Sequence, residues 1–265
     1  MNNNIRYELS FKNISQLENK LNFCKLNNIK NINIPCKGFI KKDLLNSTIK
    51  YISKNYDEFN VTYHYSLYHQ YSKNKENSYR EFLDFVKSSQ TNKNFEILLV
   101  SGSNKKKNFD SVHVLADLKK EKNLKVKFGI AYNPYLKKYY NISSERERFE
   151  KKFSTGLINS IWFQYGTDIK VLQNEVNYLR NIANEEKLNL FGSLFIPSKQ
   201  FIARFKFRPW KEVYISDKCL YSLENFFDFT NDLVSFYKKN NITPVIESDF
   251  SSSKKLDYVY SFLEN

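Results

Sequence analysis

Residues 94–110 read NFEILLVSGSNKKKNFD. The run Phe95–Val100 has the length and the mainly apolar composition of a buried strand. The small residues that follow it, Ser101–Ser103, are typical of a turn, and Lys105–Lys107 make the next part of the loop cationic. This stretch predicts a strand whose carboxyl end leads into a turn and a positively charged loop.

Similar short runs recur along the chain, with helical patterns between them. The predicted strands are Ile5–Phe11, Ile29–Ile34, Asn60–Leu67, Phe95–Val100, Lys125–Tyr132, Ile158–Gln164, Leu188–Phe195 and Ile242–Ile246. Apolar residues at helical spacing mark Ile14–Leu26, Leu44–Tyr56, Ser78–Lys87, Ser144–Phe153, Ile169–Asn184 and Leu223–Lys238. Parallel strands joined by crossover helices require such an alternation, at a spacing of about 30 residues. The pattern predicts a single (β/α)8 barrel domain over residues 1–265.

The composition indicates a globular protein. The chain is 41% hydrophobic and 17% aromatic, which argues against disorder, and no apolar run reaches the roughly 20 residues of a membrane-spanning helix. Its first residues contain no apolar signal segment, which predicts a cytoplasmic protein. The cysteines, Cys24, Cys36 and Cys219, lack the spacing of a disulfide framework or a metal site and are expected to be reduced thiols.

The net charge of +14 raises the question of an anionic partner. Lysines occur in almost every connecting segment rather than in one stripe, so a solvated surface is the first interpretation and an anionic ligand or cofactor the second. A basic barrel that binds nucleic acid is the non-enzyme alternative. Whether the protein forms a homo-oligomer is left open.

The segment Pro197–Lys218 interrupts the alternation of strands and helices. It is predicted to be a long loop with a short helix, of the kind that carries binding function. Cations and aromatic residues alternate in it: Arg204, Lys206, Arg208 and Lys211 with Phe205, Phe207 and Trp210. Such a pattern suits a polyanionic tail or a single-stranded nucleic acid.

The carboxyl ends of the strands form the active face of a (β/α)8 barrel, which gives a rule for selecting candidates. The segments at the predicted ends are Glu8, Pro35–Gly38, His64–Tyr68, Ser101–Ser103, Tyr132–Pro134, Gln164–Asp168 and Phe195–Gln200. Each of them also has an ordinary interpretation as a turn or core residue.

The order of these motifs resembles the methylenetetrahydrofolate reductase family, which consists of flavin-dependent (β/α)8 barrels of one-carbon metabolism. YELSFKN with Glu8 is similar to the family's FEFFPP, TYHYSLY with His64 to HLTC, LVSGS with Gly102 to LRGD, and IAYNP with Tyr132 to AAYPE. FEKKFSTGL is similar to the helix K(R/K)KVDAGA, IWFQYGTD with Gln164 to ITQFFFD, and FGSLFIPSKQF to PGILPVSNFKQ. The resemblance is collinear and covers nearly the whole chain.

The resemblance implies an oxidoreductase that reduces 5,10-methylenetetrahydrofolate to 5-methyltetrahydrofolate with FAD and a nicotinamide donor, NADH or NADPH, in methionine biosynthesis. It implies Glu8 as the general acid, because a carboxyl group at the mouth of a barrel can have its pKa raised by desolvation. The implied FAD contacts are His64, Ser101, Gly102, Tyr132, Glu145, Lys151 and Lys152, with the lysine pair at the diphosphate and Glu145 near the ribose.

The implied folate contacts lie later in the chain. Gln164 would bind the pterin through both amide functions, and Phe195 or Phe201 would stack on the aminobenzoate, with Gln200 beside them. A polyglutamate tail would then meet the cations of Pro197–Lys218.

This chain departs from the family at the turn after the fourth strand. The family has an aspartate beside the flavin where this chain has Ser103, and an arginine where it has Ser101. Ser103 is kept as a catalytic candidate because a serine can still donate to the flavin, but the acid that would stabilise positive charge on the folate is missing. Three alternatives stay open: a divergent reductase, a folate-binding relative without flavin, and a folate-dependent methyltransferase or demethylase.

Overall fold

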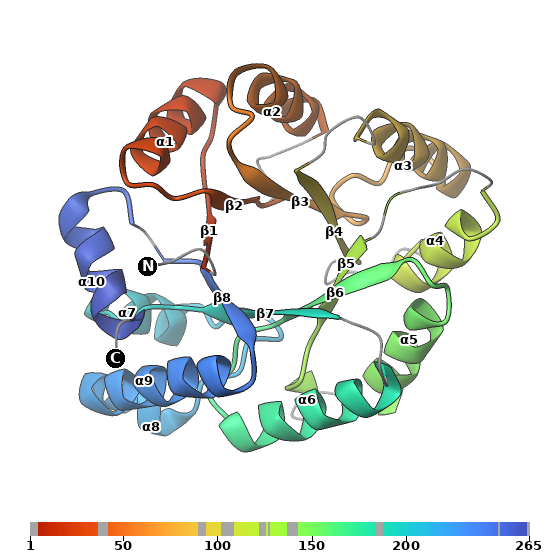
Figure 1. The fold of residues 1–265 in the computed structure, drawn as a ribbon. Helices are drawn as coiled ribbons and strands as arrows, with labels where there is room; N and C mark the ends of the chain where they lie inside the picture. Colours follow the sequence, from red (N-terminus) through yellow and green to blue (C-terminus); the bar gives the residue numbers. More distant parts are fainter. Residues whose placement is uncertain are drawn as a thin grey trace. The chain divides into compact units, whose positions relative to one another are not determined.

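Eight parallel strands close into a barrel in the order β1-β2-β3-β4-β5-β6-β7-β8 and alternate with helices (Figure 1). The computed structural model describes residues 5–36, 42–89, 94–101, 109–121, 126, 128–136, 143–183, 188–248 and 250–263. The (β/α)8 fold that the strand and helix patterns predicted is therefore confirmed.

The strands are β1 (Arg6–Glu8), β2 (Asn31–Ile34), β3 (Asn60–Ser66), β4 (Phe95–Val100), β5 (Phe128–Tyr132), β6 (Ile158–Phe163), β7 (Asn189–Leu194) and β8 (Ile242–Ile246). The helices are α1 (Ile14–Leu26), α2 (Lys42–Asn55), α3 (Lys75–Ser89), α4 (Ser111–Leu118), α5 (Ser143–Phe153), α6 (Ile169–Ala183), α7 (Lys199–Phe207), α8 (Asp217–Tyr221), α9 (Leu223–Lys239) and α10 (Ser253–Leu263).

The chain divides into two compact units. The first unit comprises Met1–Ala131 and Arg148–Ser160, and the second comprises Tyr132–Glu147 and Ile161–Asn265. That all 265 residues form one domain stays a prediction. In the part of the chain that the structure describes, no helix is long and apolar enough to cross a membrane.

In the first unit, the strand register decides which side chains share a face. Glu8 of β1 pairs with Asn33 of β2, and Asn33 pairs with Thr62 of β3. Successive residues of a strand point to opposite faces, so the residues two positions away, Arg6 and His64, lie on the same face as these three.

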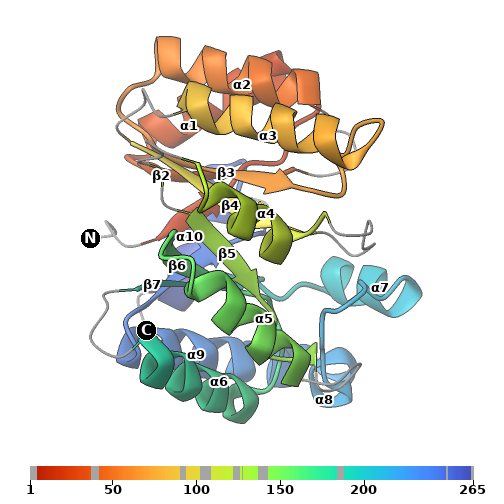
Figure 2. The same ribbon diagram turned by 90° about the vertical axis from the view of Figure 1, so that its right-hand side faces the viewer.

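The other face of β3 packs against the helices. The Tyr65 ring lies 4.7 Å from the Phe82 ring and 4.8 Å from the Phe85 ring of α3, measured between centroids. Figure 2 shows α1, α2 and α3 together on this side of β2 and β3. The helices thus cover the aromatic face, and the polar face of these strands is turned to the barrel interior.

In the second unit, a close approach between β7 and α9 requires a glycine. A Cβ atom at Gly192 would overlap the ring of Tyr237 on α9. The Tyr237 hydroxyl donates a hydrogen bond of 2.9 Å to the Ser193 carbonyl, which fixes the ring there. On the neighbouring strand, Trp162 stacks on Phe191 with 4.0 Å between ring centroids.

Three helices go beyond the sequence-based expectation: α4, α8 and α10. The predicted loop Pro197–Lys218 contains all of α7, whose first turn is capped by Ser198 through a 3.0 Å hydrogen bond from the Phe201 amide, and the start of α8. The loop prediction was therefore correct about one helix and missed the second. Cys24, Cys36 and Cys219 are buried thiols, as expected.

Candidate active site

The first unit holds a buried carboxyl group at the end of β1. Glu8 is the last residue of this strand, and its side chain is 5% exposed. Its Oε2 atom lies 4.0 Å from Nδ1 of His64 on β3. The resemblance linked these two residues to one site, and the structure brings them together on the inward face.

Hydrogen-bonding contacts link His64 to two further residues on the inward face, Asn33 and Arg6. Nδ2 of Asn33 lies 3.3 Å from Nε2 of His64, and Oδ1 of Asn33 accepts a 2.8 Å hydrogen bond from Nε of Arg6. Arg6 also donates through Nη2 to the carbonyl oxygens of Ile32 and Asn60, at 2.9 and 3.0 Å. The guanidinium is thus held rigidly below Glu8.

A second acid lies deeper on the same face. Glu96 of β4 accepts hydrogen bonds from Thr62 at 3.2 Å and from Ser160 at 2.5 Å. Burial raises the pKa of Glu96, although both hydroxyls and the charge of Arg6 act in the opposite direction. Burial also lowers the pKa of Arg6 to about 10, which leaves it cationic at neutral pH.

Sequence reasoning missed Arg6, Asn33 and Glu96. The signal for Arg6 was present, because a residue two positions before Glu8 on a strand must share its face. Asn33 and Glu96 depend on the register between strands, which the sequence does not display. Together they make the inward surface of β1–β4 a connected polar network.

A second cluster in the first unit lies where β4 ends and α4 begins. Asp110 caps α4 by accepting from the backbone amides of Val112 and His113 at 3.0 and 3.1 Å. Nη1 of Arg148 donates to its Oδ2 atom at 2.9 Å, and Nη2 of Arg148 reaches the Ser101 hydroxyl at 3.4 Å. Burial alone would raise the pKa of Asp110, but the hydrogen bonds from Arg148 and His113 hold it well below its usual range.

The predicted FAD residues on the first unit lie in different settings. Ser101 belongs to the Asp110 cluster, with its hydroxyl 2.8 Å from that of Ser111. Lys151 is exposed on α5, whereas Lys152 is only 2% exposed and directs its Nζ atom to the Ala131 carbonyl at 3.4 Å. The predicted lysine pair therefore does not act as a unit. Gly102 and Ser103 lie outside the described residues.

In the second unit, Tyr132 is bound inside the protein. Its hydroxyl donates to Oε2 of Glu175 on α6 at 2.5 Å, and Arg146 donates to both oxygens of the same carboxylate at 2.7 and 3.1 Å. Burial and the neighbouring Glu175 raise the pKa of Tyr132 above its ordinary value. Glu145 is also buried, and its Oε1 accepts from the Asn133 amide at 3.4 Å.

The predicted folate contacts all belong to the second unit. Gln164 follows β6, is half-buried, and accepts a 3.1 Å hydrogen bond from the Tyr165 amide through Oε1. Phe195 and Phe201 stack at 5.3 Å between centroids, and Trp210 lies 5.2 Å from the first and 5.5 Å from the second. The structure thus brings the two predicted phenylalanines together, while Gln200 is exposed at the start of α7.

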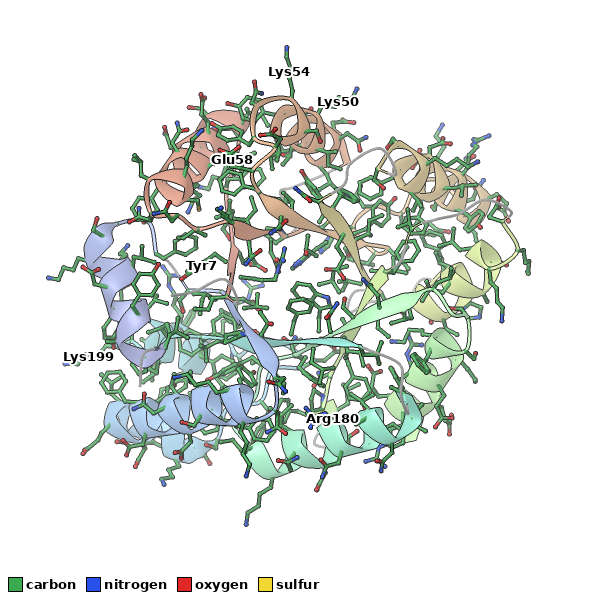
Figure 3. All side chains as sticks on the ribbon, in the orientation of Figure 1. Tyr7, Lys50, Lys54, Glu58, Arg180 and Lys199 are labelled. Carbon is green, nitrogen blue, oxygen red and sulfur yellow. The ribbon has the colours of Figure 1, made fainter. Side chains whose placement is uncertain are left out.

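Lysines lie on helices of both units. Lys50 and Lys54 project from α2, and Lys199 lies at the start of α7 (Figure 3). Lys206 of α7 sits over the Tyr221 ring, with Nζ 4.4 Å from the centroid. This scatter agrees with a solvated surface more than with one continuous basic stripe.

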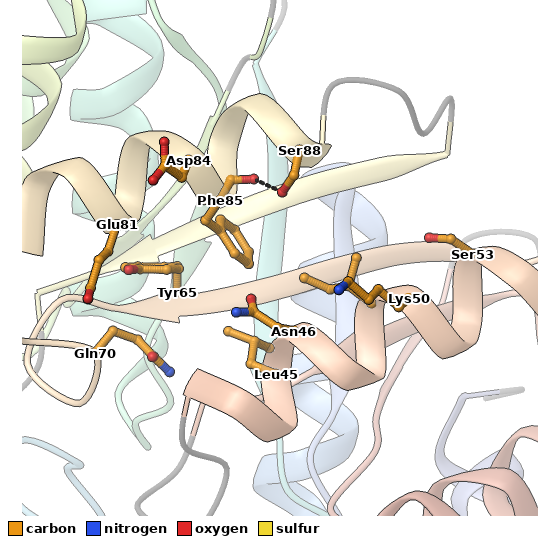
Figure 4. A pocket seen from close by; sticks show the side chains of 11 residues that line it. Leu45, Asn46, Lys50, Ser53, Tyr65, Gln70, Glu81, Asp84, Phe85 and Ser88 are labelled. Atoms are coloured by element: carbon orange, nitrogen blue, oxygen red, sulfur yellow. Dashed lines mark hydrogen bonds between the residues drawn. The ribbon is translucent and has the colours of Figure 1, made fainter.

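A cavity of about 500 Å³ lies between α2 and α3 on the helix side of β3 (Figure 4). Tyr65, Gln70, Glu81 and Phe85 are among the residues that line it, and none of the lining residues was predicted to bind FAD or folate. In the part of the chain that is described, no cluster of three or more histidine, cysteine or acidic residues could hold a metal ion.

Sequence comparison does not assign the chain to a family. No protein-family profile matches it, and no curated protein matches its sequence.

Comparison of structures finds other barrels. An uncharacterized protein from Clostridium thermocellum that binds two copies of 5-methyl-5,6,7,8-tetrahydrofolic acid matches with a TM-score of 0.63 and 12% identity, over 98% of this chain and 93% of that one. Active domain 2 of a thermostable chitinase from Pyrococcus furiosus, solved with chito-oligosaccharides, matches with a TM-score of 0.55 and 11% identity, over 98% and 96%. At such low identity both likenesses show the same thing, which is that this chain has the fold of these (β/α)8 proteins.

Proposed function

We propose that this barrel binds a reduced folate and acts on it as a methylenetetrahydrofolate reductase-like enzyme, with Glu8 as the proton donor. The observation that carries the proposal is the buried Glu8 carboxyl at the end of β1, beside His64 and above a polar interior. A structural relative that binds 5-methyltetrahydrofolic acid supports the choice of ligand, and the collinear motifs support the type of reaction.

The chemistry explains why a carboxyl group is needed. Reduction to the 5-methyl group breaks the bond between the bridging methylene carbon and N10, the nitrogen outside the pterin ring, while the bond to N5 remains. The electron pair stays on N10, which takes a proton, and the carbon receives a hydride. A carboxylic acid that is shielded from water and held at the mouth of the barrel suits the proton-transfer part of this reaction.

The hydride donor is a separate question, because the described residues fit FAD poorly. Lys152 is buried and directed to a backbone carbonyl, Tyr132 is bound to Glu175, and the cation of Arg148 is paired with Asp110. A diphosphate would have to compete with each of these contacts. The proposal therefore assigns proton transfer to Glu8 without depending on the identity of the hydride donor.

These same contacts favour a second candidate, a folate-dependent one-carbon enzyme without flavin. A carboxyl group that protonates a folate nitrogen also serves methyl transfer, since it improves the nitrogen as a leaving group. Glu8 would then protonate N5, the nitrogen that carries the methyl group, instead of N10.

One set of assays separates the two candidates. The purified protein is titrated with FAD and its visible spectrum recorded, and turnover of 5,10-methylenetetrahydrofolate with NADH or NADPH is then measured. Saturable flavin bands and nicotinamide oxidation are expected for the reductase. Methyl transfer from 5-methyltetrahydrofolate without nicotinamide would select the second candidate, and the failure of both folates to bind would reject the proposal.

A further inference from the structure

The hydrogen bonds around His64 determine which of its ring nitrogens carries the proton. Asn33 touches His64 on one side and Arg6 on the other, and its side chain is fully buried between them. The side-chain amide of Asn33 has an oxygen that accepts hydrogen bonds and an NH2 group that donates them. If one neighbour can only donate, the oxygen must face that neighbour, and the NH2 group then faces the other one.

Arg6 provides the fixed reference. A guanidinium has only donors, and therefore the atom of Asn33 that lies 2.8 Å from Nε of Arg6 has to be the oxygen. Turning the amide over would place its NH2 group against the Arg6 N–H. Because both groups are buried, that contact between two donors would be costly.

Because the Asn33 oxygen accepts from Arg6, the NH2 group of Asn33 faces His64. The separation between Nδ2 of Asn33 and Nε2 of His64 is 3.3 Å. A hydrogen bond across this distance requires a lone pair on Nε2, so the single proton of the neutral ring is on Nδ1. A doubly protonated ring would oppose the Asn33 N–H with its own Nε2–H, which disfavours the cation.

We propose that Arg6 and Asn33 form a lock that holds His64 as the neutral Nδ1–H tautomer, with the protonated nitrogen 4.0 Å from Oε2 of Glu8. Among the strands β1, β2 and β4, the charged side chains are Arg6 and Glu8 on β1 and Glu96 on β4, and β2 carries none. Neither nitrogen of the locked ring can take a proton from Glu8, because Nδ1 already carries one and Nε2 accepts from Asn33. His64 is therefore a fixed donor and not a proton shuttle.

The lock has a consequence for catalysis, and this part rests on the proposed function. When Glu8 gives its proton to a folate nitrogen, it becomes a carboxylate, and the protonated Nδ1 of His64 lies 4.0 Å from its Oε2 atom. The attraction stabilises the product form of the acid, while His64 neither gains nor loses a proton. His64, Asn33 and Arg6 are thus positioning residues, and Glu8 is regenerated by solvent or substrate.

Nitrogen-15 NMR tests the lock without any substrate. The chain has three histidines, His64, His69 and His113, so the variant His64→Gln identifies the signals of His64 by their loss. Two-bond correlation spectra of the full-length protein should show a protonated Nδ1 and an unprotonated Nε2 for His64 near neutral pH. His113 serves as an internal reference, because its Nδ1 lies 2.9 Å from Asp110 and away from the lock.

In the isosteric variant Asn33→Asp, we expect the proton of the His64 ring to be on Nε2 instead of on Nδ1 alone. A carboxylate accepts from both neighbours, so Nε2 of His64 should become protonated and its signal should shift to the protonated type. Asn31→Asp, on the same strand, adds the same charge where the side chain contacts Ile5 and Asn60 instead, and it should leave His64 unchanged.

Two results would overturn the lock: an Nε2–H tautomer of His64 in the natural protein, or an unchanged His64 pattern in a folded Asn33→Asp variant. If the NMR pattern is as expected and folate is neither bound nor turned over, the lock stands and the proposed function fails. If the enzyme is active and His64 has the other tautomer, the proposed function stands and the lock fails.

Discussion

Each of the two units contains a buried glutamate next to a proton donor, and the two arrangements differ. In the second unit, Glu175 receives three hydrogen bonds of 2.5 to 3.1 Å from Tyr132 and Arg146. In the first unit, the ring nitrogen that faces Glu8 is 4.0 Å away, beyond hydrogen-bonding distance. Short bonds on both oxygens suit a structural role, in which Glu175 on α6 joins Tyr132 of β5 to Arg146 of α5. The pairing of Glu8 with His64 is longer, and Glu8 is the residue that we propose as the proton donor.

The largest effect that follows from this contrast concerns turnover. Glu8→Gln keeps the size of the side chain and removes the transferable proton, so the rate of folate reduction should fall by about 10²–10⁴-fold. Binding of the folate should change little, which calorimetry can check. The matched control is Glu58→Gln, at a position where the carboxylate pairs with Lys25 at 3.0 Å on the outside of the first unit (Figure 3). Equal activity of both variants would remove Glu8 from the mechanism.

The second effect concerns stability. Glu175→Ala leaves the buried Tyr132 hydroxyl and the Arg146 guanidinium without their partner, and the free energy of unfolding should fall by about 3 kcal/mol. Urea denaturation measures the change. Asp257→Ala, which removes a negative charge from an exposed position of α10, should cost less than about 0.5 kcal/mol. A loss as small as that of the control would mean that the three short bonds do not hold the second unit together.

Much of the fold could be predicted from the sequence, because strands and helices repeat with different periods. The apolar run Phe95–Val100 and the periodic segment Ile14–Leu26 have the predicted bounds in the structure. Helix α4 has only eight residues, which is too few for a helical period to be recognised in the sequence. Helix α10 was not recognised either, although it has eleven residues.

The candidate site was harder to predict, because its residues come from different strands and meet only through the register of the sheet. Glu8 and His64 came from the resemblance, and the structure places them on one face. For Tyr132, the sequence allowed a cofactor contact or a core position, and the deciding partner, Glu175, lies 43 residues further along the chain. Lys152 likewise looked like half of an exposed pair on a charged helix, whereas its side chain is buried against Ala131.

A third and smaller effect should appear in acid. The pKa of Asp110 is depressed, so its stabilising contribution is complete above the pKa of the unfolded chain, near 3.9, and is lost as the pH falls towards the folded-state value. Asp110→Asn should lower the free energy of unfolding by about 1–2 kcal/mol at pH 7. Urea midpoints of the variant and the natural protein should stay apart from pH 7 to pH 5 and should begin to approach each other between about pH 4 and pH 3. A difference that persists unchanged at pH 3 would show that the charge of Asp110 does not stabilise the fold.

The smallest expected effect is on the binding of a polyglutamylated folate, and it concerns the surface cations of α7. If the cations meet a polyglutamate tail, Arg204→Gln and Lys206→Gln should each weaken binding of a polyglutamylated folate by about 2–5-fold and leave the monoglutamate unaffected. Lys54→Gln on α2 is the control, since it removes an exposed lysine from the other unit (Figure 3). If these variants instead lower the salt dependence of oligonucleotide binding, the nucleic-acid interpretation gains support.

The central claim is that Glu8 serves a bound reduced folate, and a calorimetric titration of the natural protein and of Glu8→Gln with 5-methyltetrahydrofolate tests it most directly. The account predicts saturable binding to both proteins, together with a proton exchanged with the buffer in the natural protein that is absent in the variant. The absence of any binding heat, or the same proton exchange in both proteins, would contradict it.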